Sequence, residues 1–278
     1  SRSTALGYSA LFAQNFTTAT DSYNIAVGYN AGGSVTTGVR QTLIGGLAGD
    51  ALTTALDNVA VGYAALGAET SGARNVAIGS QALLAQNVNG GSAVYNTAVG
   101  YAAGTATTTG VANTLIGGLA GDALTDADSN VAVGQNALSA DTLGSLTTAI
   151  GQGALANQNF TTATNTHNTA VGYDAGSAVS TGIYNTLIGS QSGDALTDGN
   201  NNVAVGPNSL GSETRADRNV AVGSYALAAQ NLTTDTDSYN TAVGALAGTA
   251  ITTGTENTLM GGIAGDALTD ADGNTAVG

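Results

Sequence analysis

Asn24-Ile25-Ala26-Val27-Gly28 is a five-residue phrase that returns along the whole chain, as Asn58-Val59-Ala60-Val61-Gly62 and finally as Asn274-Thr275-Ala276-Val277-Gly278. The glycines that close the phrase are 21, 17, 17 and 17 residues apart, and this series repeats to give a superrepeat of 72 residues. Units this short cannot bury a core of their own and must stack on their neighbours. The spacing predicts a solenoid whose closing glycines are Gly7, Gly28, Gly45, Gly62, Gly79, Gly100, Gly117, Gly134, Gly151, Gly172, Gly189, Gly206, Gly223, Gly244, Gly261 and Gly278.

The residues around Ala26 alternate as in a β-strand. Ile25 and Val27 share one face, because alternate side chains of a strand point the same way. We expect that face to form one wall of each coil, and the piece Tyr63-Ala64-Ala65-Leu66 to form the other wall as a second strand. Ala26 then points toward a closely packed partner surface. Every fourth coil enlarges this position, and the leucines should meet one another at that surface: Leu43, Leu115, Leu187 and Leu259.

These features predict an all-β protein, a single-chain parallel β-solenoid of about 16 coils. Coils stacked ~4.8 Å apart would make a rod of roughly 75 Å. We expect one continuous segment over residues 1–278 without a second domain, divided into superrepeats at about 7–78, 79–150, 151–222 and an incomplete 223–278. Because the chain starts and stops within the pattern, we expect it to belong to a longer protein.

Two polar ladders accompany the phrase. Asn stands four residues before most closing glycines, where its side chain can hydrogen-bond along the stack. Thr or Ser stands eight residues after most of them, for example Thr36, Thr53 and Thr70. In the longer coils Asn15, Asn87, Asn159 and Asn231 take that second place, and the four extra residues should bulge outward as loops that display contacts.

Composition excludes several classes of function. The chain has 41 glycines and one proline, but it is 42% hydrophobic and strictly periodic, so disorder is not expected. It has no cysteine and therefore no disulfides. A net charge of −14 argues against nucleic acid and against anionic membranes. Neither a signal peptide nor an apolar run of membrane-spanning length occurs.

Acidic residues suggest one metal hypothesis. Asp122, Asp126 and Asp128 precede Asn130, and Asp266, Asp270 and Asp272 precede Asn274 in the same pattern. Such oxygens can bind calcium, but the first superrepeat has Thr54 and Leu56 instead, and no complete calcium-binding loop is present. We prefer turns in which Asp and Asn bond their own backbone, with calcium as the alternative.

Charged and aromatic residues form further rows. Arg40, Asp57 and Arg74 stand five before their glycines, which predicts an ion-pair ladder of little energetic value. Most tyrosines and the single histidine stand in two further rows. We interpret them as edge caps that pack on neighbouring coils, with glycan or protein binding as the alternative. The rows are Tyr8, Tyr29, Tyr63, Tyr101 and Tyr173 after the glycine, and Tyr23, Tyr95, His167 and Tyr239 before the strand.

The phrase also resembles a known family. Asn75-Val76-Ala77-Ile78-Gly79-Ser80-Gln81-Ala82 and Asn219-Val220-Ala221-Val222-Gly223-Ser224 are similar to the head repeats of trimeric autotransporter adhesins, the YadA-like head family. The resemblance covers the whole chain and implies a left-handed parallel β-roll, three chains side by side and an adhesive role on the cell surface. Similar repeats occur in phage tail fibres. The repeats here are longer than is usual for the family, and no stalk or membrane anchor is in this sequence.

The sequence therefore predicts a non-catalytic adhesive or fibre-forming segment, extracellular and on a cell or virion surface. We assign it no catalytic, cofactor-binding or metal-binding residue. Its expected partners are copies of itself, as a homotrimer or end to end, and a host or matrix protein or glycan, without nucleic acid or membrane insertion. A filament subunit or phage tail-fibre shaft stays open as an alternative, as does an ice-binding solenoid suggested by the Thr ladder.

Overall fold

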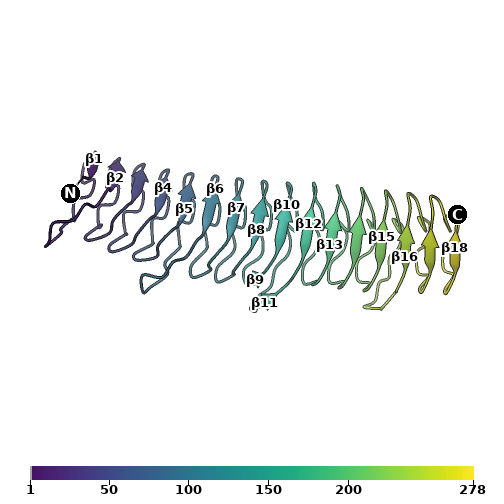
Figure 1. The fold of residues 1–278 in the computed structure, drawn as a ribbon. Coiled ribbons are helices and arrows are strands. Elements are labelled where there is room, and N and C mark those ends of the chain that lie inside the picture. The colour runs from purple at the N-terminus through teal and green to yellow at the C-terminus, as the bar shows by residue number, and fades with distance from the viewer. Residues whose placement is uncertain (1) are drawn as a thin grey trace. The chain divides into compact units, whose positions relative to one another are not determined.

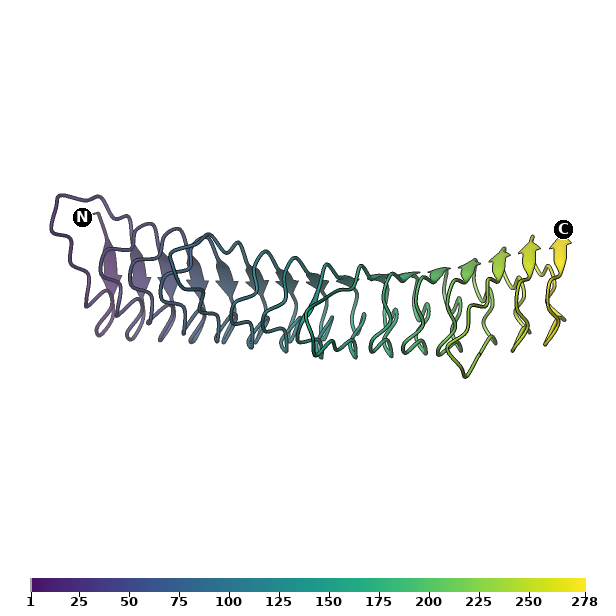
Figure 2. The same ribbon diagram turned by 90° about the horizontal axis from the view of Figure 1, so that it is seen from below.

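The computed structural model describes residues 2–278. They form two compact units, of which the first ends at Asn136 and the second spans Ala137–Gly278. Each unit is a parallel β-solenoid in which successive coils stack on one another (Figures 1 and 2). This confirms the predicted all-β solenoid, and 16 strands within the described residues carry the phrase. None of residues 2–278 belongs to a helix that could cross a membrane. One continuous segment divided into superrepeats stays a prediction.

Unit 1 has one three-residue strand in each coil. Each strand pairs in parallel with the next in register, so that Ala26 lies beside Leu43 and Leu43 beside Ala60. The strands are β1 (Thr4–Leu6), β2 (Ile25–Val27), β3 (Thr42–Ile44), β4 (Val59–Val61), β5 (Val76–Ile78), β6 (Thr97–Val99), β7 (Thr114–Ile116) and β8 (Val131–Val133).

Unit 2 repeats this arrangement and adds a short second sheet. The stacked strands are β10 (Thr148–Ile150), β12 (Thr169–Val171), β13 (Thr186–Ile188), β14 (Val203–Val205), β15 (Val220–Val222), β16 (Thr241–Val243), β17 (Thr258–Met260) and β18 (Thr275–Val277). The second sheet pairs β9 (Gly144–Ser145) with β11 (Thr164–Asn165) in parallel. It joins the root of one four-residue insertion to the preceding coil, below the main strands in Figure 1.

The strand side chains point in the reverse of the predicted directions. Ala26, Leu43 and Ala60, at the centres of β2, β3 and β4, are fully buried inside their own coils. The branched neighbours point outward, and Ile44 keeps 39% of its surface exposed. The space between the two walls of a coil is so thin that small residues fill most of it, and the large branched side chains face away. The prediction that Leu43, Leu115, Leu187 and Leu259 meet a partner surface is therefore wrong.

The core accommodates Leu43 in place of the smaller alanine because glycines in the turns leave space for its side chain. A Cβ atom on Gly32 would stand 2.6 Å from Cδ1 of Leu43, and one on Gly49 would stand 2.8 Å from Cδ2. An alanine-centred coil that precedes a leucine-centred one has glycine four residues after its closing glycine, such as Gly32 in the coil of Ala26. Other coils with a central alanine bury a leucine at that place, such as Leu66 after Gly62. This exchange of large and small residues keeps the thickness of the core constant.

The second wall consists of turns and not of the predicted strand. Ala64 and Leu66 have left-handed φ angles of 53° and 54°, which no strand contains. The amide of Ala64 donates to the Gly46 carbonyl at 2.9 Å, and the amide of Leu66 donates to the Ala82 carbonyl at 3.0 Å. The backbone of this wall therefore bonds to the coils on both sides, and it buries Ala65 and Leu66 as expected.

The Asn ladder is a buried connection between coils, as predicted. Oδ1 of Asn58 accepts the backbone N–H of Asn75 at 2.9 Å, and Nδ2 of Asn58 donates to the Gly72 carbonyl at 2.9 Å. In unit 2 the backbone N–H of Asn219 likewise donates to Oδ1 of Asn202 at 3.0 Å. Each Asn thus satisfies backbone groups of the following coil that would otherwise be buried without a partner.

The closing glycines stack at the corner of the coil. Gly62 has a φ of 135°, and a Cβ atom there would stand 2.5 Å from the carbonyl oxygen of Gly79. A side chain therefore does not fit, which confirms the close backbone approach expected of this position.

Candidate functional site

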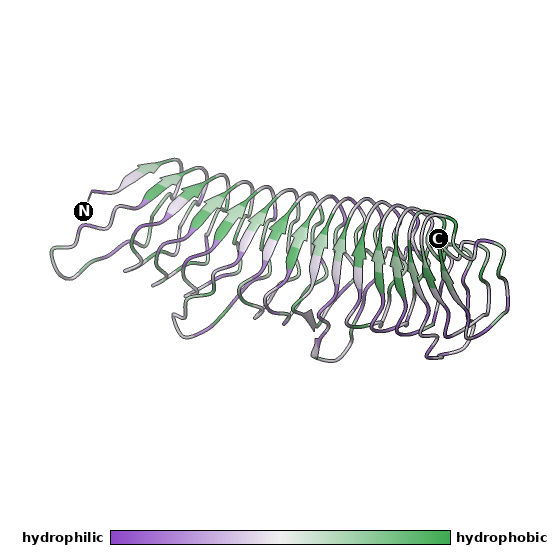
Figure 3. Cartoon of the chain, turned by 45° about the vertical axis from the view of Figure 1, so that its right-hand side comes forward, coloured by the Kyte–Doolittle hydropathy of each residue, from purple (hydrophilic) through white to green (hydrophobic). Residues whose placement is uncertain are grey.

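The outward face of the stacked strands carries a continuous row of large apolar side chains on each unit, beside a row in which threonine is the commonest residue. Two rows of mostly β-branched side chains cover it, one and three positions before each closing glycine. In unit 1, Ile25, Ile44 and Ile78 are 42%, 39% and 38% exposed, and in unit 2 Ile150 and Ile188 are each 38% exposed. Figure 3 shows apolar colour along the strands and polar colour mainly in the connecting segments. A continuous row of exposed apolar side chains is typical of a protein–protein interaction site.

A row of charged and aromatic residues borders this face. It lies five residues before each glycine and holds four of the five arginines of the chain. The guanidinium of Arg74 lies 5.6 Å from the ring centre of Tyr95, and Arg218 lies 5.7 Å from that of Tyr239. Its charged and aromatic members are Arg2, Tyr23, Arg40, Asp57, Arg74 and Tyr95 in unit 1, and His167, Tyr184, Arg218, Tyr239 and Glu256 in unit 2. Other coils have small or uncharged residues at this place, such as Ala112 and Ser129.

The predicted ladder of Arg40, Asp57 and Arg74 forms in part. Nε of Arg40 bonds Oδ1 of Asp57 at 2.5 Å, and Nη2 of Arg40 bonds Oδ2 at 3.0 Å. This pairing holds the pKa of Asp57 below its ordinary value, with a smaller contribution from the Arg74 charge. Arg74 itself donates to the hydroxyl of Tyr95 at 3.1 Å. The cation–π contact with Tyr95 thus takes the place of a second ion pair.

In the acidic segments, individual aspartate carboxylates accept separate hydrogen bonds. Asp126 accepts the Thr109 hydroxyl at 2.5 Å, and Asp128 accepts the Val111 amide at 2.7 Å. Asp272 accepts the Thr255 amide in the same way at 2.7 Å. These three carboxylates bond the preceding coil. Nδ2 of Asn274 does donate to the Asp272 carbonyl at 3.3 Å within its own turn, so the predicted bonding within the turn is seen in part. Within residues 2–278 no three His, Cys, Asp or Glu side chains gather as metal ligands would.

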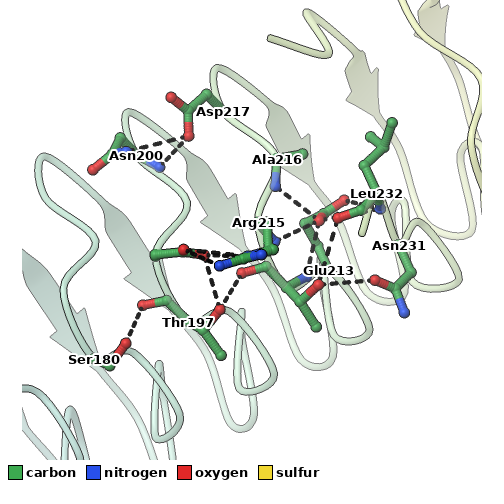
Figure 4. A network of polar contacts seen from close by, with 11 residues as sticks. Ser180, Thr197, Asn200, Glu213, Arg215, Ala216, Asp217, Asn231 and Leu232 are labelled. Atoms are coloured by element: carbon green, nitrogen blue, oxygen red, sulfur yellow. Dashed lines mark hydrogen bonds and ion pairs between the residues drawn. The ribbon is translucent and has the colours of Figure 1, made fainter. Parts of the chain in front are cut away.

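The hydroxyls of the Thr ladder form hydrogen bonds within the solenoid. Oγ1 of Thr53 donates to the Thr70 carbonyl at 2.9 Å, and Oγ1 of Thr197 donates to the Thr214 carbonyl at 2.8 Å. In Figure 4 the same kind of bond joins Ser180 to Thr197. These hydroxyls connect coils, so the ladder offers little support for ice binding.

The tyrosines after the closing glycine stay exposed, and one pair packs along the stack. Tyr8 and Tyr29 stack with ring centres 5.6 Å apart, although they are 75% and 61% exposed. In the bordering row, His167 stacks on Tyr184 at 5.1 Å. Packing on neighbouring coils, the preferred prediction, is therefore seen at these two pairs. Tyr184 was not among the predicted members of this row, although it stands at the same place in its coil as His167.

Buried carboxylates, which were not predicted from the sequence, anchor the insertions. Oε1 of Glu213 accepts the backbone amides of Arg215 and Ala216, each at 2.9 Å (Figure 4). Oε2 accepts Nε2 of Gln230 at 3.0 Å and the amide of Leu232 at 3.2 Å, where the insertion of the next coil begins. Glu213 is fully buried, and its equivalents one and two superrepeats earlier are Asp141 and Glu69. The spacing of 72 residues between these acidic residues is the signal in the sequence that could have identified them.

The same corner of the coil carries an exposed ion pair. Nη2 of Arg215 lies 2.8 Å from Oδ2 of Asp198 in the preceding coil, and this contact holds the pKa of Asp198 below its ordinary value. Because both side chains are partly exposed to solvent, the pair contributes little to stability.

Comparison with known protein families, with curated proteins and with solved structures finds no significant match to this chain.

Proposed function

We propose that this chain is a non-catalytic, homotrimeric fibre or adhesive segment of an extracellular surface, on a cell or a virion. The observation that carries the proposal is the outward sheet face, where a row of Val, Ile, Leu and Met side chains and a second row of Thr, Val and Ile lie partly exposed on each unit. A surface that exposes this repeated apolar pattern is stabilised when another copy covers it.

The bordering row supports association between copies of the chain. Arg, Tyr and Asp side chains line one edge of the apolar face, an arrangement found at the rims of protein interfaces. Arg and Tyr are also enriched among the residues that dominate binding energy. The number of three chains comes from the resemblance to the YadA-like head repeats. Attachment to a target would then rest on repeated weak contacts made stronger by multivalency.

Light scattering of the purified chain tests the assembly. We expect a mass of about three times the 26.9 kDa of one chain. Ile44→Asp and Ile188→Asp place charges on the outward face and should give a monomer with an unchanged circular-dichroism spectrum. Thr234→Asp on an exposed loop is the matched control and should stay trimeric.

Two outcomes would count against the trimer. A monomeric wild-type chain would overturn it, and so would a mass that both face variants leave unchanged. A mass that keeps growing with concentration would favour the filament alternative, in which chains add end to end.

A further inference from the structure

Four consecutive coils of unit 2 leave a groove of about 370 Å³ beside their turns. Its lining includes Asp194, Asn208, Gly211, Tyr225 and Thr249. The groove lies in the turn wall and not on the outward strand face, so the proposed trimer interface does not account for it.

The groove exists because two successive coils have only glycine and alanine where their neighbours have larger side chains. The position five residues after the closing glycine holds Asp194, Gly211, Ala228 and Thr249 in turn. Asp194 and Thr249 therefore stand at the two ends, three coil spacings or about 14 Å apart. A Cβ atom on Gly211 would stand 3.5 Å from Oδ1 of Asp194, so the carboxylate reaches toward the glycine floor.

One wall of the groove carries an aromatic ring and an amide. Asn208 and Tyr225 stand two residues after their glycines with left-handed φ angles of 55° and 59°. Tyr225 keeps 47% of its surface exposed. The side chain of Asp194 is partly buried, and this burial, with a smaller contribution from Asp174, raises the pKa of its carboxyl group. Hydrogen bonds to such a group are stronger than they are in bulk solvent.

Unit 1 provides an internal comparison. Two superrepeats earlier, Asp194 and Gly211 correspond to Asp50 and Gly67, whereas Tyr225 becomes Gln81 and Ala228 becomes Leu84. A Cβ atom on Gly67 would stand 3.2 Å from Cδ1 of Leu84, so leucine covers the glycine there. Gln81 has a φ of 63°, close to that of Tyr225, so the same backbone accepts either residue. The open floor and the aromatic ring are therefore features that unit 2 has at these positions and unit 1 does not.

We infer that this groove binds a neutral oligosaccharide. A sugar ring presents an apolar C–H face, which suits the exposed face of Tyr225, and a rim of hydroxyls, which suits a carboxylate, an amide and the Thr249 hydroxyl. The net charge of −14 and Asp194 at the end of the groove disfavour acidic saccharides. A length of about 14 Å accommodates a short run of sugar rings. The inference rests on the proposed attachment function and names the class of its target.

An array of neutral and acidic oligosaccharides identifies the probe, and titration calorimetry of the strongest neutral binder measures its affinity. Tyr225→Gln and Ala228→Leu each introduce the residue that unit 1 carries on an equivalent backbone, so both should fold. We expect each variant to lose about tenfold or more in affinity, because stacking or space is removed. Leu84→Ala in unit 1 is the matched control and should bind as the wild type does.

The outcomes separate this inference from the proposed assembly. Binding of no neutral saccharide overturns it, as does a preference for acidic saccharides, and so does binding that survives both Tyr225→Gln and Ala228→Leu. Light scattering of the same samples reports the trimer independently. A trimer that binds no saccharide overturns only the groove, and a monomer that binds one overturns only the assembly.

Discussion

Nε2 of Gln86 donates a 3.1 Å hydrogen bond to Oε2 of Glu69 in the preceding coil, and both side chains are fully buried. Oε1 of Glu69 also accepts the backbone amides of Ser71 and Gly72, at 3.0 and 2.6 Å. A carboxylate with four lone-pair sites and no donor is well suited to converging N–H groups. The pair thus fixes the corner from which the four-residue insertion leaves the coil.

Glu69→Gln should destabilise unit 1 by about 1–3 kcal/mol. The amide that replaces one carboxylate oxygen would point a donor at N–H groups, and at least one of them would lose its acceptor. Denaturant unfolding measures the change. Glu256→Gln, an exposed position, is the control and should change stability little. Equal stability of Glu69→Gln and the wild type would show that the carboxylate does not anchor the corner.

Leu43→Ala should cost about 2–5 kcal/mol, because it leaves a cavity between two turns. Gly32→Ala should also destabilise, since its Cβ would stand 2.6 Å from Cδ1 of Leu43. The double variant has no such clash. The losses of stability of Leu43→Ala and Gly32→Ala should therefore add up to more than the loss measured for the double variant. Additive costs in a double-mutant cycle would contradict the proposed exchange of space between these residues.

The sequence predicted the stacking but not the direction of the side chains. Periodicity shows that Ile25 and Val27 share a face, yet it does not say whether that face is inside. The deciding information is the thinness of the coil, which depends on the left-handed turns after the glycine, at residues such as Ala64 and Leu66. Alanine and leucine carry no sequence signal for that conformation.

The candidate site was predicted in parts. Arg40 and Asp57 could be paired because opposite charges stood at equal places in adjacent coils. The groove around Tyr225 could not be found that way. It results from small residues in two adjacent coils, and it can be recognised only when the structure shows that Ala228 and Gly211 line the same groove.

Gly62→Ala should destabilise strongly, because its Cβ would stand 2.5 Å from the Gly79 carbonyl oxygen and the residue has a φ of 135°. Gly46→Ala is the matched control, since the nearest atom to its Cβ would be Cδ2 of Tyr63 at 3.8 Å. Thermal unfolding should separate the two variants clearly. Similar melting temperatures would show that the corner can widen.

Calcium should not change the melting temperature. Asp126 and Asp128 accept hydrogen bonds from Thr109 and Val111, so each carboxylate already serves the preceding coil. Thermal unfolding with added calcium and with a chelator tests this. A rise in melting temperature that the chelator reverses would restore the metal hypothesis, because a ligand that binds the folded state stabilises it.

Stability should respond to pH with opposite signs at two aspartates. Burial raises the pKa of Asp122 in the folded state above the ordinary value of 3.8, and its Oδ1 is buried without a hydrogen-bond partner. Ionisation of Asp122 therefore destabilises the folded state once the pH exceeds both the raised pKa and the ordinary one. Asp122→Asn should accordingly raise the melting temperature at neutral pH. The gain should disappear as the pH falls below 3.8.

Asp57 provides the contrast. Its pairing with Arg40 lowers its folded-state pKa below 3.8, so the pair's contribution is complete above that value and is lost as the pH falls through the lowered one. Asp57→Asn should therefore lower the melting temperature slightly at neutral pH and have no effect in strong acid, a small change because the pair is exposed. Melting curves of both variants between acid and neutral pH check the signs. A stabilising Asp57→Asn or a destabilising Asp122→Asn at neutral pH would contradict the assigned causes.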